Sequence, residues 1–373
     1  NVNKVIDFII VPIFILCLII TCMIINKFSF NATNFDSLVR NSPLDGLRGI
    51  LALSVLVHHF YITYFWKTTG LWKRPESDLL NNFGAIAVSF FFLITGYLFI
   101  SKIQKEKINW KQLYISRIRR IVPLYLFVVI IIFSITLIYI DVPYSIVELF
   151  NWMGKWILFR GGDLEGFPTG IIIAGVNWTL TYEWAFYLLL PLLHAIFHRK
   201  FNNKKVLFFS ILIFFFMVYK TSKSIYLLFL LSYPAIYYKN EINIFFNKNK
   251  NKLSLFLSLL LIYCAFFTTA YSLQQKIILG VIFCFMANGF SFFGVLNIRS
   301  MKILGDISYS TYLIHGLILY ILFTILNIFN FNNSLYLYYM YFPLVFLIVV
   351  LVSFATYIFI EKPFLHRKII NKS

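Results

Sequence analysis

The chain has 373 residues, of which 60% are hydrophobic and only 13% are charged, whereas about a quarter of the residues of a soluble domain are charged. These proportions exclude a soluble globular protein, and the nearly continuous apolar runs exclude a membrane β-barrel, whose strands alternate apolar and polar positions. The net charge of +19 comes from basic residues in short segments between the apolar runs. This pattern indicates membrane topology and contact with membrane lipids rather than nucleic acid.

The apolar runs predict an all-α polytopic membrane bundle of about 11 transmembrane helices. A hydrocarbon core of about 30 Å needs roughly 20 helical residues per span. The candidate spans are 5–26, 45–66, 83–101, 118–140, 177–197, 206–219, 222–238, 253–271, 276–296, 303–328 and 336–361. The first lacks the small-residue cleavage site of a signal peptide and is long enough to span, so we expect a retained anchor.

The basic residues also predict the orientation of the bundle. Most of the 33 Lys and Arg residues lie on the side that holds segments 27–44, 102–117, 198–205, 239–252 and 297–302 and the C-terminus. Because cytoplasmic loops carry an excess of Lys and Arg, we expect this side to be cytoplasmic and the N-terminus to lie outside.

The cysteines and the external loop do not by themselves indicate a function. The four cysteines all fall in apolar segments and show no metal-type spacing, so we interpret them as packing residues and expect no metal. The sizeable external loop, 141–176, combines acidic residues with Trp152 and Trp156. This composition suits sugar binding, but it equally suits a half-helix at the membrane surface with its tryptophans in the interface.

Three ionisable residues, His59, Glu183 and His315, lie well inside predicted spans. Such residues are costly in lipid unless they face a protein interior or a wet cavity, so they indicate function. At about 1.5 Å of rise per residue, each lies about 9–12 Å below the predicted outer surface. A His and a Glu at one depth can form a general base with an orienting carboxylate. For a single buried His, the alternative is a hydrogen-bonded structural residue.

Arginines at the cytoplasmic ends of two predicted spans are the second indication of function. Arg117 and Arg120 are i,i+3 neighbours on one helix face and can hold a phosphate or pyrophosphate together. Arg48 adds a third cation at the start of another span, where Asp45 can cap the helix. Ordinary cytoplasmic arginines are the alternative interpretation. We expect a binding site for a phosphorylated cytosolic ligand, with the His and Glu residues deeper in the same bundle.

Six segments occur in a defined order along the chain. They are LDGLRG at 44–49 followed by His58 and His59, FFFLITGYL at 90–98, the R-x-x-R-I-x-P-x-Y pattern at 117–125, NWTLTYEWAFYLLLPLL at 177–193, ISYSTYLIH at 307–315, and EKP at 361–363. With this set the chain resembles the acyltransferase 3 family of integral-membrane O-acyltransferases. Thr95 stands where a Ser is common in the family.

The resemblance implies roles for the same residues. His59 corresponds to the expected catalytic base, and Arg117 and Arg120 to the pair associated with the acyl-CoA donor. Glu183 corresponds to an expected site residue, whereas His315 is either a site residue or a structural one. The family usually has about ten spans, so we expect an anchor span and linker at 1–43, the acyltransferase domain at 44–363 and a basic cytoplasmic tail at 364–373.

The expected function is O-acylation at a bacterial inner membrane, with acetyl-CoA as the donor co-substrate. The expected acceptor is a hydroxyl of a surface polysaccharide, lipopolysaccharide or lipid-linked glycan. Direct transfer and transfer through an acyl-enzyme are both allowed. The alternative function is a proton-coupled transporter or flippase, in which the His and Glu residues would relay protons and the arginines would bind an anionic substrate. The sequence leaves the oligomeric state open.

Overall fold

The structure is a computed structural model that describes residues 2–28, 35, 42–198, 208–212, 215, 221–327, 331 and 334–365. Its helices are α1 (Val2–Lys27), α2 (Pro43–Thr69), α3 (Asp78–Ile103), α4 (Trp110–Tyr139), α5 (Ile146–Ile157), η2 (Thr169–Ile173), α6 (Trp178–His198), η3 (Lys223–Ile225), α8 (Tyr226–Leu230), α9 (Tyr233–Tyr237), α10 (Lys239–Lys248), α11 (Lys250–Phe267), α12 (Leu273–Ala287), η4 (Val295–Asn297), α13 (Arg299–Asp306), α14 (Ser308–Tyr320), η5 (Ile321–Ile325), α15 (Leu335–Met340), α16 (Phe342–Thr356), η6 (Tyr357–Glu361) and α17 (Lys362–Leu365). Within these residues the only β-type pairing is one isolated bridge between Leu164 and Phe167, so the predicted all-α class is confirmed.

The predicted membrane bundle is also confirmed. In the described part of the chain, eight helices are long and apolar enough to cross a membrane: Ile9–Lys27, Pro43–Thr69, Asp78–Ile103, Trp110–Tyr139, Trp178–His198, Lys250–Phe267, Ser308–Ile325 and Phe342–Leu365. Two further predicted spans correspond to the shorter apolar helices Tyr226–Tyr237 and Leu273–Ala287. Most of predicted span 206–219, and the tail from 366 onward, lie outside the described residues. The count of eleven spans therefore stays a prediction.

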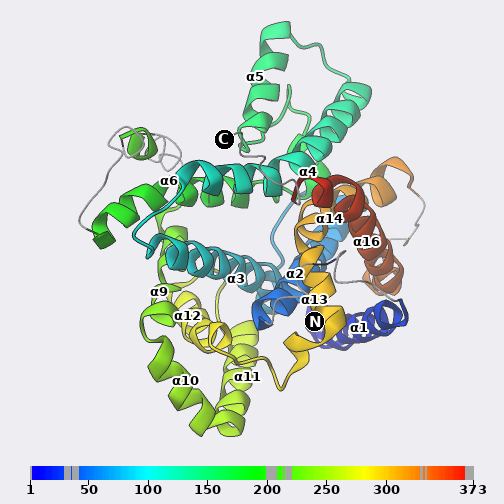
Figure 1. Ribbon diagram of the computed structural model, residues 1–373. Coiled ribbons are helices and arrows are strands. Elements are labelled where there is room, and N and C mark those ends of the chain that lie inside the picture. Colours follow the sequence, from blue (N-terminus) through cyan, green and yellow to red (C-terminus); the bar gives the residue numbers. More distant parts are fainter. Residues whose placement is uncertain are drawn as a thin grey trace.

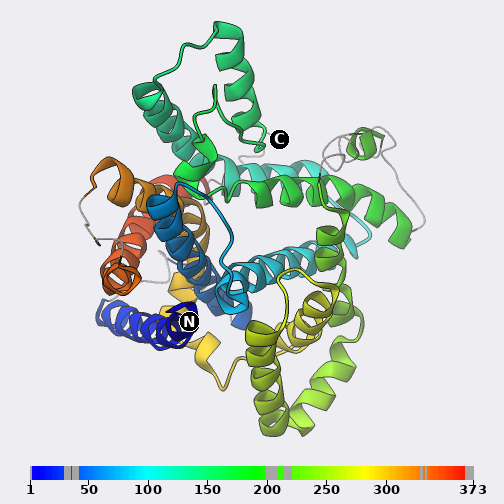
Figure 2. The ribbon, with the colours of Figure 1, turned by 180° about the vertical axis from the view of Figure 1, so that it is seen from behind.

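Helix α2 lies in the middle of the bundle, where it packs against α3, α13 and α14. Figure 1 and the reverse view in Figure 2 show α1 beside α16 on one side of this centre, while α10, α11 and α12 group on another side. Helix α5 lies at the top of both views, where it packs against the C-terminal half of α4. The predicted span 336–361 is interrupted at Tyr341, between α15 and α16, and Pro343 lies in the first turn of α16.

Helices α2 and α13 approach so closely that glycine is required on both. A Cβ atom on Gly305 would lie 1.8 Å from the carbonyl oxygen of Asp45, and one on Gly49 would lie 2.7 Å from the Cβ of Leu304. Small residues at such crossings let two membrane helices bring their backbones together. The glycines of the LDGLRG segment therefore fix the position of α2 against α13.

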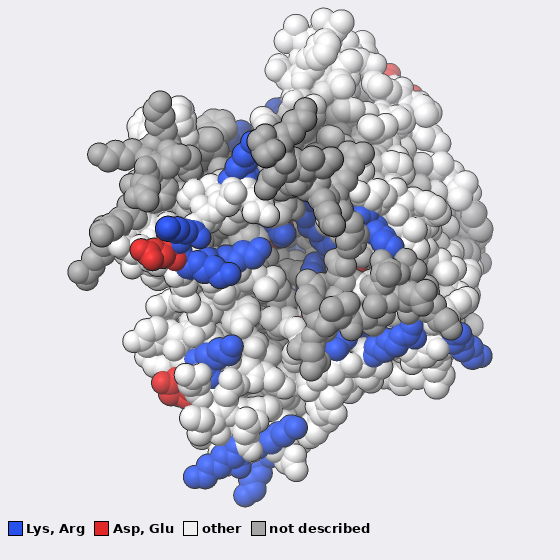
Figure 3. Space-filling view, viewed as in Figure 1, with Lys and Arg blue, Asp and Glu red and all other residues white. Residues whose placement is uncertain are grey.

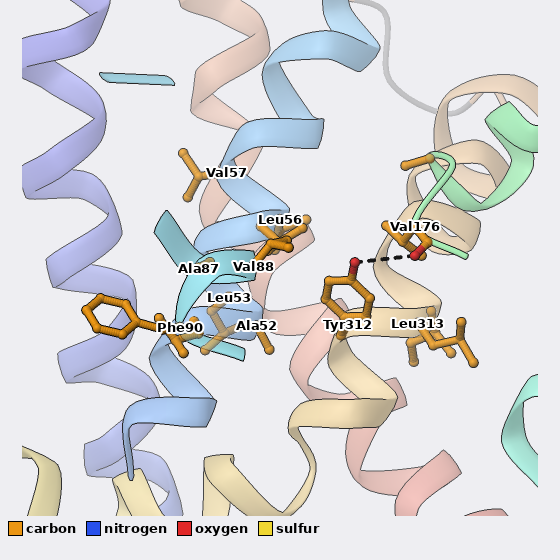
Figure 4. Close-up of a cluster of buried hydrophobic side chains, with 14 of the residues drawn as sticks. Ala52, Leu53, Leu56, Val57, Ala87, Val88, Phe90, Val176, Tyr312 and Leu313 are labelled. Atoms are coloured by element: carbon orange, nitrogen blue, oxygen red, sulfur yellow. Dashed lines mark hydrogen bonds between the residues drawn. The ribbon is translucent and has the colours of Figure 1, made fainter. Parts of the chain in front are cut away.

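Apolar side chains complete the contact between α2, α3 and α14. Leu53 and Leu56 of α2 are buried, as are Ala87 and Val88 of α3. Figure 4 shows these side chains gathered between the two helices, with Tyr312 reaching from α14 toward the backbone of Val176. Close packing of this kind fixes side-chain directions inside the bundle, because interiors contain few voids.

The loop at 141–176 folds around its own tryptophans. Trp152 and Trp156 of α5 are 2% and 0% exposed, and their indole N–H groups donate to the carbonyl oxygen of Gly162 at 2.9 Å and 3.2 Å. The hydroxyl of Thr169 donates to the same carbonyl oxygen. These indoles are structural. They form neither an exposed platform for a sugar nor an exposed belt at the membrane surface.

The close contact at Gly305 predicts that a single added methyl group lowers the stability of the protein. Gly305→Ala places a Cβ against the Asp45 carbonyl, and overpacking of this kind typically costs about 1–3 kcal/mol. We expect a lower Tm in detergent than for the wild type. Gly154→Ala is the control, because a Cβ there meets nothing within 4 Å. Equal Tm values for Gly305→Ala and the wild type would contradict the proposed packing.

Candidate functional site

Two histidines from different helices meet inside the bundle. Nδ1 of His59 on α2 lies 2.9 Å from Nε2 of His315 on α14, and the two rings stack with centroids 5.0 Å apart. His315 is completely buried, whereas His59 is half-buried. A ligand can therefore reach His59 but not the ring of His315.

The hydrogen bonds around this pair determine where its protons lie. Nδ1 of His315 is 3.1 Å from the carbonyl oxygen of Thr311, which can only accept, so Nδ1 carries the proton. Nε2 of His315 then has a lone pair and accepts from Nδ1–H of His59. This arrangement leaves the lone pair of His59 on Nε2. His315 thus holds His59 in the tautomer with the proton on Nδ1 and the lone pair on Nε2.

The Trp72 ring and a small cavity lie beside His59. The Trp72 ring lies 6.4 Å from the His59 ring and nearly parallel to it. His58 turns away from His315, and its Nδ1 lies 2.9 Å from the carbonyl oxygen of Leu80. His58 and His59 both line a cavity of about 140 Å³, together with Arg74 and other residues described below. We call this space the histidine cavity.

A larger cavity of about 410 Å³ contains the predicted arginines. Among the described residues that line it, the cations are Arg48, Lys102, Arg117 and Arg120. The structure therefore brings the three predicted arginines to one space, which we call the cationic cavity. Figure 3 shows basic side chains around a hollow on the face of the molecule seen in Figure 1, with few acidic ones.

The ends of two helices place these cations. Ser42 caps α2 by accepting from the backbone N–H of Leu44 at 3.3 Å, and Pro43 begins the helix, so Arg48 lies in its second turn. Asn109 caps α4 in the same way through Gln112. Capping fixes where each helix starts, and therefore the level at which its arginines enter the bundle.

Arg117 and Arg120 have different surroundings. The Arg117 guanidinium lies 4.9 Å from the centre of the Phe99 ring, and no described carboxylate forms an ion pair with it. Arg120 lies 3.4 Å from Glu361, which is 1% exposed and also accepts from the Ser310 hydroxyl. Removing Arg120 would leave a buried carboxylate without its counter-ion, which is strongly destabilising. Arg117 is thus the freer of the two to bind a ligand.

Glu183 lines the cationic cavity and not the histidine cavity. Its Oε1 accepts from the hydroxyl of Tyr187 at 2.8 Å and from that of Thr95 at 3.1 Å. His59 is hydrogen-bonded to His315 instead. The predicted convergence of the three residues therefore holds for the two histidines, while Glu183 faces the arginines. Depth along a helix does not determine the direction in which a side chain points, and the position of Glu183 in the sequence does not indicate that direction.

The two cavities adjoin each other. Val88 of α3 and Tyr312 of α14 line both of them. The Tyr312 hydroxyl is 3.0 Å from Thr179 Oγ1 and 3.3 Å from the carbonyl oxygen of Val176 (Figure 4). The two cavities thus meet at Val88 and Tyr312. Arg48 and His59 are separated by eleven residues of α2, a rise of roughly 16 Å.

Sequence reasoning missed several residues of these cavities. Lys102 was grouped with the loop that follows α3, although it lines the cationic cavity from the last turn of that helix. Arg74 and Trp72 lie in the segment between α2 and α3, which carries no periodic pattern. Glu361 belongs to the EKP segment, and its role as the partner of Arg120 could have been suspected only from its burial within an apolar run.

The cationic cavity is built largely from the six ordered segments of the sequence, and these segments also supply His58, His59, Trp178 and Tyr312 to the histidine cavity. The family described as acyltransferase domain matches residues 41–358, which is most of the chain. The match includes the predicted site residues His59, Glu183 and His315 and the arginines Arg48, Arg117 and Arg120, whereas Glu361 lies just beyond it. The chain belongs to this acyltransferase family. No solved structure matches the chain significantly.

Relatives of the chain include proteins of known and unknown activity. An uncharacterized protein of Haemophilus influenzae is 33% identical over 167 residues, which cover 40% of this chain and 64% of that protein. O-acetyltransferase OatA of Staphylococcus aureus is 25% identical over 178 residues, or 44% of this chain and 26% of that protein. Peptidoglycan O-acetyltransferase OatA of Listeria monocytogenes is 25% identical over 181 residues, with the same shares. The chain thus aligns with only about a quarter of each OatA protein.

The histidine tautomers can be measured directly. We expect solid-state NMR of the ¹⁵N-histidine-labelled protein in lipid bilayers, above neutral pH, to show the proton on Nδ1 in both His59 and His315. His198 is an internal contrast, because its Nε2 lies 3.0 Å from the carbonyl oxygen of Ile103 and must carry the proton. Variants in which one histidine at a time is replaced by glutamine assign each ¹⁵N signal to its residue. A proton on Nε2 of His315 would contradict the arrangement, since His59 could then no longer present a lone pair on Nε2.

Proposed function

We propose that the chain is a membrane O-acyltransferase that moves an acyl group, most simply acetyl, from acyl-CoA to a hydroxyl of a surface glycan. One observation carries the proposal: the cavity with four cationic side chains adjoins the cavity that His59 lines, and Tyr312 and Val88 line both. The first suits a phosphorylated donor and the second suits base chemistry. Membership of the acyltransferase family supports the same reaction class.

The donor binds through its phosphates. Arg117, Arg48 and Lys102 supply N–H donors and positive charge to phosphate oxygens, since arginine and lysine are the usual phosphate ligands of proteins. Arg120 contributes charge from its pair with Glu361. The arm that carries the thioester then extends past Tyr312, so that the acyl carbonyl comes close to His59.

The base in the proposed reaction is His59. Its Nε2 takes the proton of the acceptor hydroxyl while the hydroxyl oxygen attacks the thioester carbonyl. The tetrahedral intermediate collapses, the C–S bond breaks, and the CoA thiolate leaves and takes the proton back from His59. Throughout, Nδ1–H of His59 donates to His315, and this hydrogen bond strengthens when His59 becomes cationic.

Glu183 acts in this scheme from the donor side. Its carboxylate accepts from Tyr187 and Thr95 and faces the same space as the arginines. We therefore assign it to shaping the path of the donor rather than to orienting His59. The pathway through an acyl-enzyme remains compatible with the same cavities, with the acyl group passing through a protein nucleophile before it reaches the glycan.

We assign each cavity to one side of the membrane from the distribution of the basic residues. The cationic cavity lies at the end of the bundle where the basic segments concentrate, so we assign it to the cytoplasm of a bacterium, where acetyl-CoA is available. The N-terminus then lies outside and the C-terminus inside. We keep the domain limits proposed from the sequence, with an anchor span and linker at 1–43, the acyltransferase domain at 44–363 and a basic cytoplasmic tail at 364–373. The two relatives named OatA favour a cell-wall or other surface polysaccharide as the acceptor.

The donor site predicts a difference between two neighbouring arginines. Arg117→Ala should raise the KM for acetyl-CoA roughly tenfold or more, because charge-assisted hydrogen bonds to the phosphates are lost. Arg119→Ala removes the same charge from the same helix but does not line the cationic cavity, so its KM should stay near that of the wild type. Both are measured as CoA release by the purified protein with a glycan acceptor. Equal KM values for the two variants would contradict the donor site.

A further inference from the structure

The residues that line the histidine cavity differ in chemical character from those that line the cationic cavity. Besides the two histidines, its described lining includes the aromatic residues Trp178, Tyr271 and Tyr312 and the cationic residue Arg74. No carboxylate is among these lining residues. Aromatic faces suit the C–H surfaces of sugars, whereas an arginine without a carboxylate suits an anion.

Arg74 is positioned to bind a ligand in this cavity. Its side chain is exposed, and no described carboxylate forms an ion pair with it. It lines the histidine cavity together with His58 and Tyr271. A ligand that reaches His59 therefore meets the positive charge of Arg74 in the same space.

The backbone beside Arg74 is anchored rather than loose. The side-chain amide of Asn81 donates to the carbonyl oxygen of Pro75 at 2.6 Å and to that of Ser77 at 3.1 Å. Ser77 in turn caps α3 by accepting from the backbone N–H of Leu80 at 3.3 Å. These hydrogen bonds hold segment 75–77 against the start of α3. The backbone next to Arg74 therefore has a defined position at the edge of the histidine cavity.

The opposite wall is fixed by a buried polar network. Tyr271 has a φ of +60°, and its backbone N–H donates to Oε1 of Gln275 at 2.9 Å. Nε2 of Gln275 donates to Oδ1 of Asn82 at 2.7 Å, and the Asn82 amide donates to the carbonyl oxygen of Thr268 at 2.7 Å. Fully satisfied networks of this kind rigidify the structure around them. The cavity thus has two preorganised walls.

We propose that the acceptor of the acyl group carries an anionic group, a carboxylate or a phosphate, and that Arg74 binds it. This inference rests on the proposed function. The anion would hold the acceptor against Arg74 while one of its hydroxyls lies at Nε2 of His59, and Trp178 and Tyr271 would contact the sugar ring. The carboxylate would come from an acidic sugar, and the phosphate from the link between a glycan and its lipid carrier.

The test compares matched ligands that differ in charge. The purified full-length protein, with CoA present at saturation to occupy the cationic cavity, is titrated with methyl glucuronide, glucose 1-phosphate and methyl glucoside, and Kd is obtained by calorimetry. We expect at least one anionic ligand to bind about tenfold or more tightly than methyl glucoside. Preference for the glucuronide identifies an acidic sugar, and preference for the sugar phosphate identifies the lipid-linked source.

Variants assign the preference to Arg74. Arg74→Ala should abolish it and Arg74→Lys should retain part of it, whereas Lys73→Ala removes a neighbouring exposed charge that does not line the cavity and should change nothing. Equal binding of charged and neutral ligands by the wild type, or a preference that survives in Arg74→Ala, would overturn the inference. Failure of the proposed function has a separate signature, namely no acyl transfer from acetyl-CoA to any acceptor in the same preparation.

Discussion

The close contact between α2 and α13 sets the level of the histidine pair. Gly49 and Gly305 lie against each other's helix where the two backbones nearly touch, and each precedes its histidine, His59 or His315, by ten residues. Because both helical paths run in the same direction from this point, equal rises bring the two rings to one depth. A side chain larger than hydrogen at either glycine would separate the helices. The hydrogen bond that fixes the tautomer of His59 thus depends on a packing contact roughly 15 Å away.

The distribution of ionisable groups follows from their cost in an apolar bundle. Arg120 and Glu361 neutralise each other, and the two histidines and Glu183 each have hydrogen-bond partners within the chain. Arg117 faces the cationic cavity and Arg74 the histidine cavity, and neither is paired with a described carboxylate. The charges that no described carboxylate pairs therefore lie in two adjoining cavities, with Arg117 in the cationic cavity and Arg74 in the histidine cavity together with His59.

Much of this arrangement is predictable from sequence, because helical rise converts position into depth. That argument predicts that His59 and His315 share a level, and the i,i+3 spacing predicts that Arg117 and Arg120 share a face. It cannot predict rotation about a helix axis, and for this reason Glu183 was expected beside His59 although it faces the arginines. Nor can periodicity identify residues such as Arg74, whose segment is neither helix nor strand and is positioned by side-chain bonds from Asn81.

The central claim is that donor binding and base chemistry occupy separate, adjoining cavities. The most direct test uses His59→Ala in cells that lack the wild-type chain. The variant protein should still be stabilised by CoA, because the cationic cavity is intact, while mass spectrometry of the surface glycans should show that the acetyl increment present with the wild type has disappeared. A variant that binds CoA and leaves the glycans fully acetylated would contradict the account.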